Sequence, residues 1–289
     1  MRRLWAMALC AAACGGVEET NEADEPIESV APHVLPLGRE AAAGTAARLT
    51  YWGGPVVENA KVVAVLWGAA VDAQVAGKLG SFYAAFVGSS SFTWLSEYDT
   101  RTQHIGAGAL AGVYTIAPSH KGKTLTDAQI QRELSAQIRK GAVPAADADT
   151  IYMLHFPPGV RIKMGSAASC ESGGFCGFHG SFKSRTAHAR YAVIPDMGPG
   201  SGCDKGCGGG APLTAVTSVA SHELVEAVTD PDVGLAKGLA APLAWYDATH
   251  GEIADICVGH EGKLHAGGST WTVQKQWSNA ARACIVSGR

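Results

Sequence analysis

The chain has 289 residues, of which 47% are hydrophobic and 17% are charged, and its formal net charge is −3. This composition is sufficient for a packed core in one large domain or two small ones. No apolar run approaches about 18 residues, so we expect no membrane-spanning helix, and the charge balance excludes electrostatic recruitment to nucleic acid.

The first residues are typical of an export signal. Arg2 and Arg3 precede an apolar stretch, Leu4–Ala13, that is too short to cross a bilayer. Residues 11–14, Ala-Ala-Ala-Cys, resemble a bacterial lipoprotein cleavage box, which implies lipid attachment at Cys14. The alternative is an ordinary secretory signal. We therefore expect an exported protein, either a cell-envelope lipoprotein or a secreted one, whose only membrane contact is the lipid anchor.

Residues 15–48 are predicted to form an acidic, disordered tether, because few large apolar side chains accompany their acids. Residues 1–48 contain seven of the 26 acidic residues and four of the 23 basic ones, which leaves 19 of each in residues 49–289. That remainder is expected to be one formally neutral folded domain.

Candidate strands and helices alternate from residue 51 onward. Apolar runs predict buried strands at Lys61–Trp67, Asp149–His155 and Tyr191–Pro195. A helix is predicted at Val71–Phe86, and a second at Thr126–Lys140, where Gln129 can complete a cap with Thr126. These elements predict an α/β fold with a mixed central sheet flanked by helices in a single domain.

Six cysteines lie beyond the signal region, and an even number in an exported protein indicates disulfides. They are Cys170, Cys176, Cys203, Cys207, Cys257 and Cys284. Most lie in segments rich in Gly and Ser, 166–180 and 198–210, which are predicted to be disulfide-pinned loops. Their clustering favours pairing of Cys170 with Cys176, Cys203 with Cys207 and Cys257 with Cys284. The alternative is a zinc cluster built on Cys203 and Cys207.

A helix predicted to begin at Pro212 contains the sequence His-Glu-Leu-Val-Glu at residues 222–226. On a helix His222 and Glu226 share one face, so both can bind one metal ion, while Glu223 points about 100° away, where it can reach a water. This HExxE pattern is that of a zinc hydrolase with Glu in place of the second His. The competing interpretation is a solvated helix face with an isolated His.

Glu252 and Asp255 lie three residues apart and can complete the coordination. Residues 222–230, HELVEAVTD, resemble the active-site helix of the thermolysin-like metallopeptidases, and residues 252–255 resemble their second zinc helix. The resemblance implies that His222 and Glu252 are ligands, that Glu223 is the general base, and that Asp255 orients His222. Glu226 stands where that family has His, and the spacing from Glu252 to Asp255 is one residue shorter, so either acid can be the third ligand.

A second resemblance, to the phosphate-induced protein 1 family that includes the plant EXORDIUM proteins, covers residues from about 51 to 284. It is carried by the helix of His222 and by Tyr51–Pro55, Cys176–Gly180, Trp245–Tyr246, Glu252–Cys257 and Trp277–Asn279. It implies a secreted or cell-surface protein without fixing a biochemical activity.

Two further side chains are candidates for the site. His179, in a cysteine-containing segment, can serve as an additional ligand or an oxyanion donor, or it can be structural. Tyr246 is the first choice for an oxyanion donor, ahead of His250, His260 and His265.

These features predict a zinc-dependent hydrolase of the metallopeptidase type, although another divalent metal can occupy such a site. Its substrate would be a peptide or a cell-envelope polymer. One alternative is a non-catalytic EXORDIUM-like binding module with a structural metal or polar site. Another is a glycosidase that uses Glu223 and Glu252 as paired carboxylates.

Overall fold

The computed structural model describes residues 27–28, 33–38, 47–185 and 187–288 of the chain. The predicted export signal, Cys14 and most of the predicted tether lie outside the described residues. Among the described helices, none is long and apolar enough to cross a membrane.

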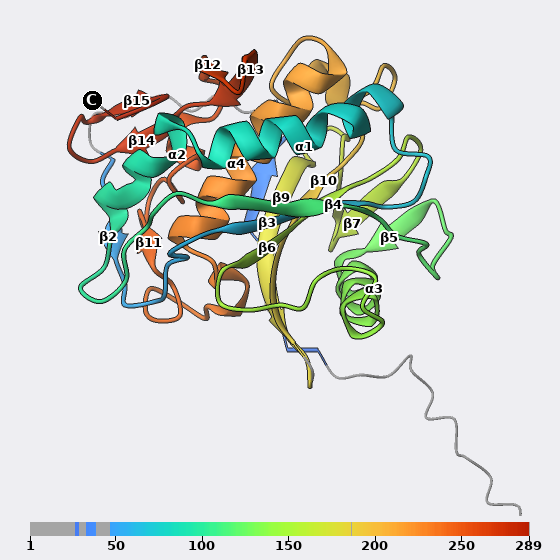
Figure 1. The fold of residues 1–289 in the computed structure, drawn as a ribbon, viewed down its shortest axis with the longest axis horizontal. Coiled ribbons are helices and arrows are strands. Elements are labelled where there is room, and N and C mark those ends of the chain that lie inside the picture. Colours follow the sequence, from blue (N-terminus) through green and yellow to red (C-terminus); the bar gives the residue numbers. More distant parts are fainter. Residues whose placement is uncertain (1–26, 29–32, 39–46, 186, 289) are drawn as a thin grey trace, which may run out of the picture.

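A six-stranded mixed sheet forms the centre of the molecule, in the order β1–β9–β10–β6–β3–β4 (Figure 1). The four strands at one side are parallel, β9 is antiparallel to β10, and β1 is antiparallel to β9. The strands are β1 (His33–Pro36), β3 (Lys61–Leu66), β4 (Ala109–Thr115), β6 (Thr150–His155), β9 (Phe175–Lys183) and β10 (His188–Ile194).

Helices cover both faces of this sheet. Helices α1 (Ala73–Val87) and α4 (Pro212–Thr229) lie on one face, and α3 (Asp127–Arg139) lies on the other (Figure 1). Successive residues of β3 alternate between the two cores, because side chains of a strand point to opposite faces in turn. Val62 packs with α1 and α4, whereas Val63 packs with α3.

The remaining elements are short. A hairpin of β12 (Glu261–Ala266) and β13 (Ser269–Gln274) packs on α4, and a second pairs β14 (Gln276–Ser278) with β15 (Ala283–Ile285). The others are β2 (Thr50–Tyr51), α2 (Ser90–Thr93), η2 (Trp94–Tyr98), β5 (Thr124–Thr126), β7 (Arg161–Met164), β8 (Ala167–Ala168), η3 (Cys203–Lys205), η4 (Val233–Leu235), β11 (Trp245–Tyr246) and η5 (Asp255–Cys257).

The predicted α/β fold with a mixed central sheet flanked by helices is confirmed. The strands predicted at Lys61–Trp67 and Asp149–His155 correspond to β3 and β6, and the helix predicted at Thr126–Lys140 corresponds to α3. The capping box between Thr126 and Gln129 is present, so the first turn of α3 is stabilised as expected.

Two segments have a different structure from the one predicted. The segment 166–180 was predicted to be a loop, but β9 begins at Phe175, because Phe175, Phe178 and Phe182 pack into the core beside α3 and outweigh the intervening glycines. The tether predicted for residues 15–48 is likewise wrong for His33–Pro36, which form β1. Leu35 is buried in the core beneath α4, which stabilises this strand on β9.

The disulfide pairing favoured by the sequence is wrong for four of the six cysteines. The structure pairs Cys170 with Cys203 and Cys176 with Cys207, and only the pair Cys257–Cys284 agrees. The sheet brings the segment around β9 beside the loop that follows β10, so each bridge joins these two segments. Proximity in sequence was therefore a poor guide to proximity in space.

Candidate metal centre

Helix α4 presents the HExxE residues to the interior of the molecule. Pro212 occupies its first turn, where the missing N–H costs nothing. All its residues from Ala215 to Thr229 are buried, because α4 lies between the sheet and the β12–β13 hairpin. The interpretation of His222 and Glu226 as part of a solvated helix face is therefore wrong.

His222 and Glu226 converge with Asp255. The Nε2 atom of His222 lies 3.1 Å from Oε2 of Glu226 and 3.8 Å from Oδ1 of Asp255. His222 and Glu226 are at most 1% exposed, and Asp255 is 7% exposed. One nitrogen and two carboxylate oxygens thus meet within 4.8 Å of one another, a separation that suits ligands of a single metal ion.

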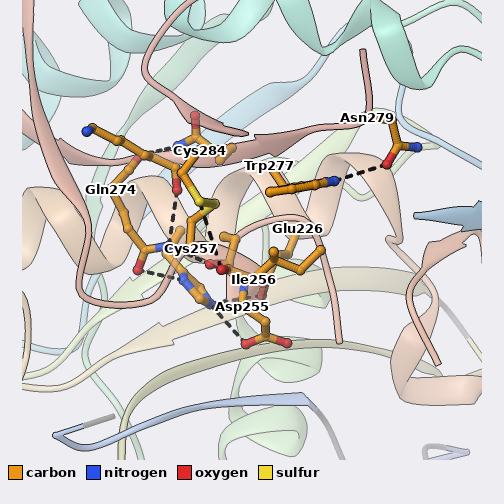
Figure 2. The surroundings of a disulfide bond; sticks show 12 residues. Glu226, Asp255, Ile256, Cys257, Gln274, Trp277, Asn279 and Cys284 are labelled. Atoms are coloured by element: carbon orange, nitrogen blue, oxygen red, sulfur yellow. Dashed lines mark hydrogen bonds and ion pairs between the residues drawn. A yellow bond between two sulfur atoms is a disulfide. The ribbon is translucent and has the colours of Figure 1, made fainter. Parts of the chain in front are cut away.

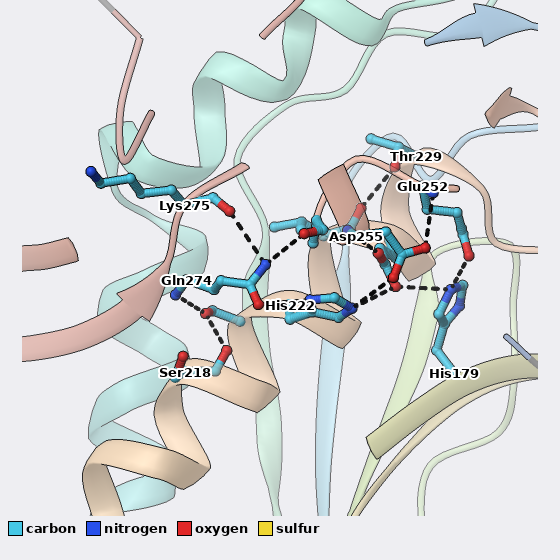
Figure 3. Close-up of polar contacts among 12 residues, drawn as sticks. His179, Ser218, His222, Thr229, Glu252, Asp255, Gln274 and Lys275 are labelled. Atoms are coloured by element: carbon cyan, nitrogen blue, oxygen red, sulfur yellow. Dashed lines mark hydrogen bonds and ion pairs between the residues drawn. The ribbon is translucent and has the colours of Figure 1, made fainter. Parts of the chain in front are cut away.

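Gln274, which the sequence analysis missed, orients the imidazole of His222. Its Oε1 lies 3.0 Å from Nδ1 of His222, and its Nε2 donates to the carbonyl oxygen of Ala254 at 2.7 Å (Figure 3). Because the amide nitrogen is committed to Ala254, Oε1 accepts and Nδ1 of His222 donates. In the neutral imidazole, the lone pair of Nε2 then faces the carboxylates, which is the tautomer that binds metals.

The resemblance to thermolysin-like peptidases implied that Asp255 would orient His222, but Gln274 makes that contact. Asp255 instead lies on the Nε2 side of the ring, and its Oδ2 accepts the backbone N–H of Glu252 at 3.1 Å. A glutamine on the strand β13 carries no sequence signal of this role, since only the packing of the hairpin on α4 brings it to His222.

The predicted second zinc helix is absent; a turn and the 3-10 segment η5 take its place. The side chain of Asp255 accepts a hydrogen bond from the backbone N–H of Glu252, and the side chain of Gln274 donates one to the backbone carbonyl of Ala254. These backbone groups are therefore not used in an α-helix. The Cys257–Cys284 disulfide holds this turn in place (Figure 2). The hydrogen bond from the N–H of Trp277 to the carbonyl of Ile253 also does so.

His179 and Glu252 form a second group around the same glutamate. His179 belongs to β9, and its Nε2 lies 3.0 Å from Oε2 of Glu252 and 3.5 Å from Oε2 of Glu226. Both side chains are fully buried. Figure 3 shows the two imidazoles on either side of the carboxylates. The structure therefore brings together all the sequence-predicted ligands, with His179 among them.

Glu223 lies against the sheet, one residue along from His222. Its carboxylate is fully buried, and neither oxygen has a hydrogen-bond partner among the described residues. Burial, followed by the charges of Glu226 and Asp255, raises its pKa well above the usual range, although His222 opposes that shift. A buried carboxylate without hydrogen-bond partners destabilises the folded protein. Side chains of this kind are typical of functional sites.

The buried acids interact strongly with one another. Burial, followed by neighbouring carboxylates, also raises the pKa of Glu252 and Asp230 well above their usual ranges. Burial lowers the pKa of His222, but Glu226, Glu223 and Asp255 outweigh that effect and raise it to about 10. This electrostatic arrangement favours the presence of positive charge among the carboxylates.

Tyr246 borders this acidic group. It lies in β11, is partly buried, and pairs with Thr50 of β2. Burial, followed by the charges of Glu252, Asp255 and Glu226, raises its pKa to about 12, so its hydroxyl stays protonated at neutral pH. His250 forms a hydrogen bond with Asp247 within the turn that follows β11, whereas His260 and His265 are exposed.

Gly177 of β9 provides the space that Glu223 occupies. A Cβ atom there would lie 2.7 Å from Oε1 of Glu223 and 2.8 Å from Cγ1 of Val219, so one of these groups would have to move. We expect Gly177→Ala to lower the free energy of unfolding by about 1–3 kcal/mol, measured by urea denaturation, because the added methyl overpacks the contact between β9 and α4.

The matched control for that variant is Gly77→Ala. Gly77 lies exposed in α1, and a Cβ there would meet no atom within 4 Å. We expect this control to raise stability by about 0.5–1 kcal/mol, as in other exposed helices. Equal stability of the wild-type protein and Gly177→Ala would contradict the close packing of Glu223 against β9.

The sequence matches no protein-family model and no curated protein, and no solved structure matches the chain. The function is therefore inferred from the chemistry of the buried site.

Proposed function

We propose that this chain is an exported, metal-dependent hydrolase whose metal is held by His222, Glu226 and Asp255, with zinc as the first choice. The observation that carries the proposal is the orientation of His222. Its Nδ1 is held by Gln274, and its Nε2 faces two buried carboxylates at 3.1 and 3.8 Å. With Nδ1 donating to Gln274, Nε2 and the two carboxylates require a cation between them, either a proton or a metal ion, and a divalent metal offsets the charge of both carboxylates.

The donor set fits a divalent ion. One imidazole nitrogen and two carboxylate oxygens are common ligands of catalytic zinc, although oxygen-rich sets also bind other divalent metals. The surrounding carboxyl groups of Glu223, Asp230 and Glu252 are buried as well, so a dication would offset repulsion that their burial intensifies. These residues therefore suit the divalent metal ion that the HExxE motif implies.

When bound, such a metal supplies Lewis-acid polarisation of a carbonyl and lowers the pKa of water. In the proposed reaction Glu223 is ionised, because a bound dication would offset the burial and the neighbouring acids that raise its pKa. Its carboxylate accepts a proton from the attacking water and returns it to the leaving group. The lack of hydrogen-bond partners on Glu223 supports this role, because no described donor occupies the lone pairs that would accept that proton. The protonated hydroxyl of Tyr246 borders the acids and is our choice as donor to the developing oxyanion.

A peptide bond is the proposed substrate, by analogy with the thermolysin-like peptidases, and a cell-envelope polymer is the other candidate. The proposed location outside the cytoplasm is supported by the resemblance to the phosphate-induced protein 1 family and by the three disulfides, which are compatible with an oxidising compartment. Attachment of a lipid at Cys14 belongs to the same proposal.

The burial of the centre favours a second candidate function, a non-catalytic surface module with a structural metal. His222, Glu223, Glu226 and Glu252 are at most 1% exposed, and structural metal sites are closed, whereas catalytic ones keep a position for water or substrate. Cobalt substitution separates the two: azide should change the visible spectrum of an open site and leave that of a closed site unchanged.

The orientation of His222 is tested by Gln274→Leu. We expect metal affinity to fall about 10- to 100-fold, measured by competition with a chromogenic chelator, because the imidazole loses the acceptor that fixes its tautomer. Thr270→Ala, on the exposed part of the same hairpin, is the control and should bind metal as the wild-type protein does. Unchanged affinity in Gln274→Leu would contradict the proposed role of Gln274 in orienting His222 for metal binding.

A further inference from the structure

Two groups of candidate ligands share a single glutamate. The first comprises His222, Glu226 and Asp255, and the second comprises His179, Glu226 and Glu252. In each group the ligand atoms lie within 4.8 Å of one another. The proposed function uses only the first group, which leaves the second, fully buried imidazole–carboxylate pair unassigned.

One carboxylate oxygen of Glu226 faces the imidazoles of both groups of candidate ligands. Its Oε1 accepts the backbone N–H of Asp255 at 3.1 Å, which fixes the carboxylate. Its Oε2 lies 3.1 Å from Nε2 of His222 and 3.5 Å from Nε2 of His179. One carboxylate oxygen is therefore placed between two imidazole nitrogens that come from different elements, α4 and β9.

From this arrangement we infer that the centre holds two divalent metal ions, one in each group, with Glu226 as the bridging ligand. The inference rests on the proposed function and extends it from one metal to two. It also gives a chemical reason for Glu226 at the position where thermolysin-like peptidases have His: a carboxylate oxygen has lone pairs for two ions, whereas an imidazole nitrogen has one.

The charges of the site agree with this inference. Three buried carboxyl groups, those of Glu226, Glu252 and Asp255, lie beside the two imidazoles, and those of Glu223 and Asp230 are buried nearby. A single dication in the first group leaves the second group without a metal ion, and a second dication there would favour the ionised form of Glu252 in this medium of low dielectric constant. Paired metals of hydrolases supply Lewis-acid stabilisation at two points of the reacting group, which suits hydrolysis of the proposed peptide substrate.

The test is metal stoichiometry in the untagged full-length protein. The protein is saturated with zinc, separated from free metal by gel filtration, and measured by elemental mass spectrometry. We expect two zinc ions per chain in the wild-type protein and one in each of His179→Ala and Asp255→Asn. Glu226→His, which removes the bridge, should hold no more than one. The control His265→Ala, at an exposed histidine, should retain two.

Loading with Mn²⁺ provides a readout that does not depend on the variants. Two ions bridged by Glu226 should give the electron paramagnetic resonance spectrum of a spin-coupled pair. One zinc per chain in the wild-type protein, retained in His179→Ala and lost in Asp255→Asn, would overturn the inferred second metal and leave the proposed function standing. No bound metal in the wild-type protein would overturn both.

Discussion

Glu223→Gln is expected to reduce hydrolysis by about 10²- to 10⁴-fold while metal content stays unchanged. Glutamine has nearly the same shape as glutamate but cannot accept the proton of the attacking water. Glu223 faces Gly177 and is not among the candidate metal ligands, so its replacement should leave the ligand set intact. Turnover of fluorescent casein and of a mixed peptide library, measured beside elemental analysis, checks both halves of this expectation.

Glu261→Gln is the matched control for this experiment. Glu261 lies partly exposed at the start of β12, outside the buried centre, and its amide variant should keep full activity. If Glu223→Gln hydrolysed the same substrates as fast as the wild-type protein, Glu223 would not be the general base. If metal were lost together with activity, Glu223 would be contributing to the metal site itself.

The stability of the protein is expected to fall below pH 6.5 because of His155, at the end of β6. Its Nε2 lies 2.8 Å from the hydroxyl of Tyr83, and burial lowers its pKa from 6.5 to about 3. Between these values the unfolded chain binds a proton that the folded chain does not, so stability is present above pH 6.5 and is lost progressively as pH falls toward 3. The expected slope is about 1.4 kcal/mol per pH unit, or roughly 3 kcal/mol at pH 4.5.

Urea denaturation of the wild-type protein and of His155→Gln across pH 4.5–8 measures this contribution. The difference in the free energy of unfolding between them removes the contribution of other titrating groups, such as Asp127, whose pKa burial raises to about 6. The difference should be constant above pH 6.5 and should decrease below it. A difference that is the same at pH 4.5 and pH 7.5 would show that His155 does not titrate in this way.

Local patterns in the sequence identified the main elements of the fold. The apolar runs that became β3 and β6 are long enough to be buried on both faces of a parallel sheet, and the cap of α3 is a short-range signal that needs no tertiary context. Segments whose structure depends on distant partners were harder to predict. Strand β9 contains glycines that resemble a loop, and only its pairing with β1 and β10 and its packing against α4 make it a strand.

In the candidate metal centre, too, local features were predictable from the sequence, whereas contacts between distant segments were not. The spacing within HExxE was enough to place His222 and Glu226 on one face of a helix, because helical periodicity is a local property. The contribution of Gln274 was not visible, since an isolated polar residue in a strand has no distinctive spacing. The disulfide partners of Cys170 and Cys176 depended equally on which segments the sheet brings side by side.

The sequence by itself determined the α/β class, the helices α1 and α3, the strands β3, β6 and β10, and the helix that carries His222, Glu223 and Glu226. These follow from hydrophobic periodicity, capping and residue spacing, which act over a few residues. Only the tertiary structure decided that Glu226 lies between His222 and His179, that Asp255 faces the metal-binding nitrogen, and that Gln274 fixes its tautomer. Such contacts join α4 to β9, η5 and β13, and their geometry is set by how those elements pack rather than by any local pattern.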